Sequence, residues 1–119
     1  MRFSLILALM FISALVQPPQ VAVVTRETPI AAKSLSGTVA WEDGGPISGA
    51  LVQICTPGWK RVLRSVQTDE HGHFSFSRAK GSGMHYLQVS HRGANTLLVK
   101  VQVGTADSKD LVIEIEPST

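Results

Sequence analysis

The stretch TDEHGHFSF at residues 68–76 decides how this 119-residue chain folds. It predicts the end of one strand, a tight turn and the start of the next strand. Asp69 is placed to fold its carboxylate back onto backbone N–H groups of the turn, and Gly72 occupies a position where such a loop needs a positive φ. Phe74 and Phe76 are two residues apart, so their rings fall on one face of the outgoing strand. This spacing predicts two buried aromatic rings that anchor the core of a small β-sandwich.

The N-terminal segment is typical of an export signal. Arg2 supplies a short positive region, residues 5–16 form an apolar run of twelve residues with one Ser, and QPPQ follows at 17–20. A membrane span needs about 20 apolar residues, so this run is too short. We expect residues 1–22 to be a secretory signal peptide and the protein to be secreted, in the periplasm or outside the cell. An uncleaved N-terminal anchor is the alternative, and it is the one contact with a membrane that we expect.

Residues 23–34 contain Pro29 and show no clear period, so we expect a linker there. From residue 35 onward, apolar and polar residues alternate, with turn residues between the runs. Seven such runs follow one another, and no stretch has helical periodicity. The pattern predicts an all-β chain, an antiparallel β-sandwich over residues 35–116. The run at 60–68 is expected to place Val62 and Val66 on one face.

Read in order, these segments resemble a carboxypeptidase regulatory-like domain. The matching residues are GTV at 37–39, GPISGALVQI at 45–54, the 68–76 stretch, LQVS at 87–90, and Gly93. The resemblance implies a transthyretin-like sandwich of seven antiparallel strands in Greek-key order. Such domains are similar to starch-binding and other carbohydrate-binding-like sandwiches, and they are usually non-catalytic, so the resemblance implies a non-catalytic module.

One position departs from the pattern of that family. The family usually has an aromatic residue two positions before the inward Leu87, where this chain has His85. Either His85 faces inward and is hydrogen-bonded, or a small bulge turns Tyr86 inward. The register of this strand stays open here, since a slip of one residue moves every side chain to the other face.

No set of residues in the sequence is typical of catalysis or of a metal site. His71 and His73 flank a turn glycine without a third ligand, whereas a catalytic zinc site needs three protein ligands. A Gly-x-Ser-x-Gly elbow is absent, and Cys55 has no evident orienting partner. Cys55 is the only cysteine, so we expect it to be buried or else to pair between chains. We therefore expect a protein that is not an enzyme and uses no metal or cofactor.

Binding is the function that the remaining residues favour. The 11 Lys and Arg residues nearly balance the 9 Asp and Glu residues, so no basic stripe points to nucleic acid. Trp59 follows Thr56-Pro57-Gly58 in a loop, where an exposed indole ring can stack on a sugar. A Trp lid that closes one end of the sandwich is the favoured alternative, since large aromatic residues are mostly buried. We name Trp59, Lys60 and Arg61 as the candidate ligand-binding residues.

The expected function is therefore binding of carbohydrate or of a cell-envelope polysaccharide. The alternative is a protein–protein interaction module or a structural module of the cell envelope. In that case an envelope protein would meet an exposed strand edge, or the outward apolar residues Leu51, Leu98 and Val112.

Overall fold

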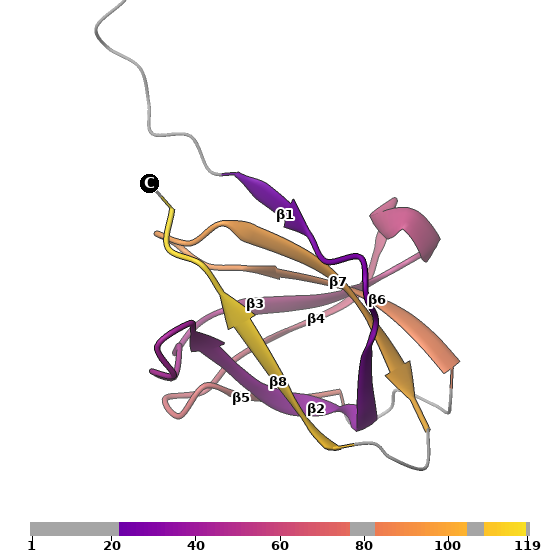
Figure 1. Ribbon diagram of the computed structural model, residues 1–119, viewed down its shortest axis with the longest axis horizontal. Coiled ribbons are helices and arrows are strands. Elements are labelled where there is room, and N and C mark those ends of the chain that lie inside the picture. Colours follow the sequence, from indigo (N-terminus) through magenta and orange to yellow (C-terminus); the bar gives the residue numbers. More distant parts are fainter. Residues whose placement is uncertain (1–21, 77–82, 105–108, 119) are drawn as a thin grey trace, which may run out of the picture.

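Eight β-strands and one short 3-10 helix make up the described part of the chain, which is residues 22–76, 83–104 and 109–118 of a computed structural model (Figure 1). The elements in chain order are β1 (Val23–Thr25), β2 (Ile30–Trp41), β3 (Leu51–Cys55), η1 (Pro57–Trp59), β4 (Val62–Gln67), β5 (His73–Ser75), β6 (Gly83–Ser90), β7 (Thr96–Val103) and β8 (Lys109–Ile115). Within these ranges, no helix has the length and apolar character that a membrane crossing requires. The expected signal peptide lies outside the described residues, except for Ala22.

The strands form two layers that share the long strand β2. The larger layer has the order β4–β3–β6–β7, and both β1 and the first residues of β2 pair with β7. β2 then passes into the smaller layer, where it lies between β5 and β8. β8 and the second half of β2 run side by side, as Figure 1 shows. The prediction of an all-β sandwich is confirmed.

Two features of the strand pairing differ from the prediction of seven antiparallel strands. Residues 23–34 are not a linker, because β1 and the start of β2 lie there, with Val24 and Ile30 packed against the core. Their pairing segments are only three residues long, too short to show a period in the sequence.

The pairings β1–β7, β2–β7 and β2–β8 are parallel. Alternation in a sequence reports which face is buried and not the direction of the neighbouring strand, so the pattern did not reveal this.

An apolar core fills the space between the two layers. Every second residue of β7, from Leu97 to Val103, is at most 8% exposed, as expected for a strand with one buried face. From the smaller layer, Leu111, Ile113 and Ile115 on β8 face these residues and are at most 1% exposed. The core therefore joins the layers along their full length and makes each sheet a rigid base for its outer face.

The turn at 68–76 takes the form that the sequence predicts. The Asp69 carboxylate accepts hydrogen bonds from the backbone N–H groups of His71 and His73, both at 2.9 Å. Gly72 has a φ of 79°, and its carbonyl oxygen accepts a hydrogen bond of 2.8 Å from Val39 N–H on β2. Phe74 and Phe76 are 5% and 4% exposed and their rings meet edge to face at 6.1 Å. The turn thus fastens the smaller layer to the core, and the predicted aromatic anchor is confirmed.

The structure settles the register of β6. Leu87 and Val89 are buried and His85 shares their inward face, while Tyr86 points outward, and the pairing with β3 and β7 is regular. The Nε2 atom of His85 is buried and has no hydrogen-bond partner in the described part of the chain. His85 therefore faces inward, as the first of the two alternatives predicts. The hydrogen bond that this alternative also predicts is not formed with any described residue.

Strand β4 differs from expectation at its first residues. Val66 is half-buried and packs against the core, whereas Val62 is 49% exposed. Ile54 pairs with Arg64 and Cys55 with Val62, so Leu63 is an extra, bulged residue of β4. The bulge breaks the alternation on which the prediction of a shared face for Val62 and Val66 relied, and it bends an edge strand.

Candidate functional site

The outer face of the larger layer is a surface that the described elements leave largely uncovered. Its side chains alternate with the core residues of β3, β6 and β7, and most are half-buried, as expected for side chains on a sheet with solvent on one side. Among the described elements, only η1 packs against it. We call this surface the open face; its residues are Leu51, Gln53 and Cys55 on β3, Val62, Ser65 and Gln67 on β4, Met84, Tyr86, Gln88 and Ser90 on β6, and Thr96, Leu98, Lys100 and Gln102 on β7.

Polar side chains form a row across the open face. The strand register places Ser65 beside Gln53, Gln53 beside Gln88, and Gln88 beside Leu98. The Gln53 amide donates a hydrogen bond of 3.3 Å to the Ser65 hydroxyl. Neighbouring strands are about 4.8 Å apart, so the polar part of the row, from Ser65 to Gln88, spans about 10 Å. It presents amide and hydroxyl groups on a rigid base.

Trp59 lies on the open face beside this row. Its indole N–H donates a hydrogen bond of 2.9 Å to the carbonyl oxygen of Leu87, in the middle of β6. Its ring meets the Tyr86 ring edge to face, with 5.1 Å between centroids. Its backbone φ is 56°, in the left-handed region that few residues other than glycine adopt. The indole is thus held half-buried on the sheet surface, and it does not close an end of the sandwich.

The loop that carries Trp59 is closed by Thr56. The Thr56 hydroxyl accepts a hydrogen bond of 3.0 Å from Arg61 N–H, and Thr56 N–H donates one of 2.9 Å to the Arg61 carbonyl. The side chains of Lys60 and Arg61 are exposed. The loop therefore brings the three predicted residues together at one margin of the open face, where only Trp59 is anchored through its side chain.

Tyr86, Gln53, Gln88 and Lys100 were not among the predicted site residues. They lie on three different strands, and only the register brings them beside Trp59. The sequence does contain a signal for them, because a glutamine occupies an outward strand position at 53, at 88 and at 102. A long polar side chain at such positions is ordinary for a solvated face, so the signal alone does not distinguish a site.

Cys55 is buried, as one of the two sequence interpretations requires. It pairs with Tyr86, so its side chain faces the same side of the sheet, yet it is only 4% exposed. Burial raises the pKa of its thiol. A protonated, buried thiol is a poor nucleophile, and Cys55 therefore contributes packing at the open face.

The histidine pair lies in the exposed turn, away from the open face. His71 and His73 have ring centroids 6.2 Å apart, and His71 Nε2 is 3.4 Å from the exposed carboxylate of Glu70. Across the described ranges, no three His, Cys, Asp or Glu side chains are grouped so that they hold a metal ion.

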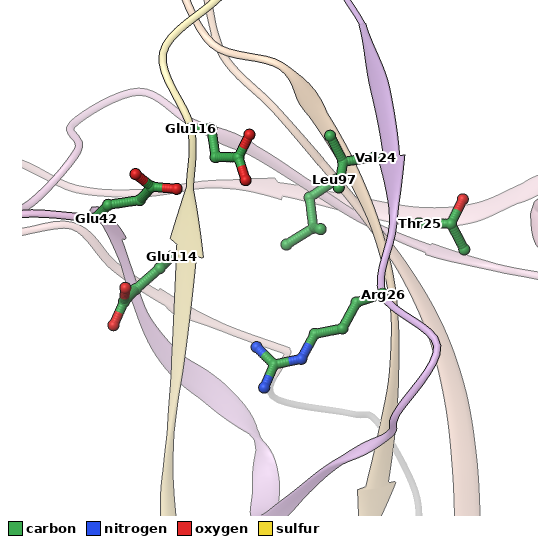
Figure 2. A pocket seen from close by; sticks show the side chains of 7 residues that line it. All are labelled: Val24, Thr25, Arg26, Glu42, Leu97, Glu114 and Glu116. Atoms are coloured by element: carbon green, nitrogen blue, oxygen red, sulfur yellow. The ribbon is translucent and has the colours of Figure 1, made fainter.

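A concave region lies between β1 and β8 and has a volume of about 380 Å³. Figure 2 shows Arg26 extending into it from the end of β1, while Glu114 and Glu116 lie on the opposite side. Val24 and Leu97 complete its apolar part. Carboxylates and a guanidinium group thus face each other across an opening at the edge of the core. The concave region therefore carries both positive and negative charges and does not favour one chemical class of ligand.

The fold and the open face together define a small β-sandwich module with a polar and aromatic surface on one sheet. A family model of the carboxypeptidase regulatory-like domain matches residues 34–116. The chain belongs to this family, whose members are regulatory β-sandwich modules that are usually non-catalytic. A search of curated proteins found no match to the chain.

Proposed function

We propose that this protein is a non-catalytic module that binds carbohydrate, in particular a polysaccharide of the cell envelope, on the open face. The observation that carries this proposal is the combination of the Gln53–Gln88 row with the Trp59–Tyr86 ring pair on one face of the sheet. Sugars offer hydroxyl groups, which exchange hydrogen bonds with amides, and apolar C–H faces, which pack on aromatic rings. The open face supplies both kinds of contact side by side.

The extent of the open face over four strands favours a polymer over a small molecule. Sites for small ligands are concave and bury most of the ligand surface. The open face instead spreads its polar groups over neighbouring strands of a sheet whose other side is the packed core. A rigid base also lowers the entropy lost on binding, because the contacting side chains start from held positions.

Export is part of the proposal, and the pattern of residues 2–20 supports it. A protein outside the cytoplasm meets envelope polysaccharides directly. A protein partner of the envelope is the alternative. Against it, Leu51 and Leu98 are half-exposed among polar neighbours, and Val112 lies on the other layer, so the three residues form no continuous apolar patch.

The proposal is tested by affinity electrophoresis of the protein through gels that contain different polysaccharides. We expect one or more polymers to retard the protein, and Trp59→Ala and Gln88→Ala to weaken this retardation, by about tenfold in affinity for Trp59→Ala. His73→Ala is the control, because His73 is exposed on the smaller layer and bonds Asp69 through its backbone N–H, which the substitution keeps. Circular dichroism checks that the variants are folded.

Two results would contradict sugar binding on the open face. One is the absence of retardation by every polymer in the panel. The other is retardation that persists unchanged in both open-face variants. The first leaves a protein partner as the better explanation, and the second moves the sugar site to another surface.

A further inference from the structure

The open face is uneven in charge. Its strand positions carry one cation, Lys100, and no Asp or Glu. Two more cations, Lys60 and Arg61, follow Trp59 at its margin. The acidic residues of the described strands, Asp110 and Glu114, are both on β8 in the smaller layer. The strand positions of the open face therefore carry one positive charge and no negative charge, in a chain whose overall charge is close to balance.

Lys100 is placed beside the aromatic pair. It pairs with Tyr86 across β6 and β7, and Tyr86 in turn contacts Trp59. Lys100 is half-buried, so its aliphatic stem packs on the sheet while the ammonium group reaches solvent. In the described part of the chain it forms no ion pair. A positive charge without a partner thus lies one strand away from the rings on which a sugar would stack.

We propose that the open face selects acidic polysaccharides, whose uronate carboxylates bind Lys100 while the sugar rings pack against Trp59 and Tyr86. This inference rests on the proposed function and specifies its ligand class. A carboxylate on a stacked sugar lies within reach of the ammonium group, because the cation and the rings occupy adjacent strands. The contact is a charge-assisted hydrogen bond on a surface without competing carboxylates at its strand positions.

A uronate polymer fits this surface better than other polyanions. A nucleic acid is bound through several phosphates at once and needs a basic stripe, whereas the strands of the open face offer one lysine. An acidic peptide would gain the charge contact but would leave the Gln53–Gln88 row without the many hydroxyl partners that a sugar chain brings. The combination of amides, rings and one cation therefore matches a polymer that is rich in hydroxyl groups and carries regular carboxylates.

The test compares polygalacturonate with its fully methyl-esterified form, which has the same backbone and no charge. Binding constants are measured at low and at high salt. We expect the acidic form to bind about threefold to tenfold more tightly at low salt, and the difference to shrink as salt screens the charge. Lys100→Gln, which keeps a long polar side chain, should remove this preference. Lys109→Gln on β8 is the matched control and should retain it.

The outcomes separate this inference from the proposed function. Equal binding of both forms overturns selectivity for acidic polymers and leaves sugar binding intact. If the protein binds neither form, selectivity for acidic polymers is overturned as well. The wider polysaccharide panel then tests whether the protein binds any sugar polymer. If polyglutamate binds as tightly as polygalacturonate and Trp59→Ala weakens neither, the attraction is a general one for polyanions, and the inference is wrong. Support requires a preference for polygalacturonate that needs both Trp59 and Lys100.

Discussion

The turn at 68–76 and the open face lie in the same small sandwich and use their polar groups in opposite ways. At the turn, Asp69 binds two backbone N–H groups. Just before it, the buried Thr68 hydroxyl donates to the Ile47 carbonyl at 2.6 Å and accepts from Ala50 N–H at 2.8 Å. On the open face, the Gln88 side chain is half-exposed and forms no hydrogen bond with a described residue.

The contrast shows which residues specify the fold and which are free to bind. A polar group whose hydrogen bonds are all formed inside the protein holds one backbone geometry, and losing it leaves buried partners unsatisfied. A polar group on the solvated side of a packed sheet costs little to change but is available to a ligand. Substitutions at the turn should therefore lower stability, and those on the open face should mainly affect binding.

Gly72→Ala should have the largest effect on stability. Gly72 has a φ of 79°, and a Cβ there would lie 2.8 Å from the Val39 carbonyl oxygen. Backbone strain and steric overlap together should cost about 3 kcal/mol or more, measured as the free energy of unfolding in urea. Gly49→Ala is the control, because its φ is 75° and no atom lies within 4 Å of the added Cβ, so strain alone should cost about 1 kcal/mol. Equal losses of stability in both variants would mean that the structure shifts to relieve the contact between the added Cβ and the Val39 carbonyl oxygen without further cost.

Thr68→Val should have the next largest effect. The change keeps the shape of the side chain and removes the hydroxyl, which leaves Ile47 O and Ala50 N without this partner in a buried site. We expect a loss of about 2 kcal/mol in the free energy of unfolding. The same change on the open face, Thr96→Val, should cost less than about 0.5 kcal/mol, since Thr96 is half-exposed there. A comparable loss of stability in Thr96→Val would mean that hydroxyl groups at the turn and on the open face contribute equally to stability.

Asp69→Asn tests the turn through pH and should have the smallest effect, because Asp69 is exposed. The backbone N–H groups of His73 and then His71 lower the pKa of the Asp69 carboxyl in the folded protein. Its contribution to stability is therefore present above the unfolded pKa, about 3.9, and is lost as the pH falls through the lower folded pKa. The stability of the parent protein should approach that of Asp69→Asn in acid. A difference between the two that stays constant from pH 7 to pH 2 would contradict the role of the charge.

Local features and long-range features of the molecule divide in the same way. Asp69, Gly72 and the two phenylalanines act within nine consecutive residues, and local geometry was sufficient to predict their arrangement. Trp59 was recognised as a candidate, but its contact with Tyr86 joins residues on separate elements and was not predicted. The expectation of a linker before residue 35 was wrong because the strand segments there are defined by pairing with β7.

By itself, the sequence determined the all-β class, the alternation that divides core from surface, and the local form of the turn at 68–76, since all three depend on neighbours in the chain. Only the tertiary structure decided the parallel pairing of β2 with β8, the inward position of His85, and the grouping of Trp59, Tyr86, Gln88 and Lys100 on one surface. These features arise from strand register and layer packing. A period of two records which side of a strand is buried and carries no information about which strand lies beside it.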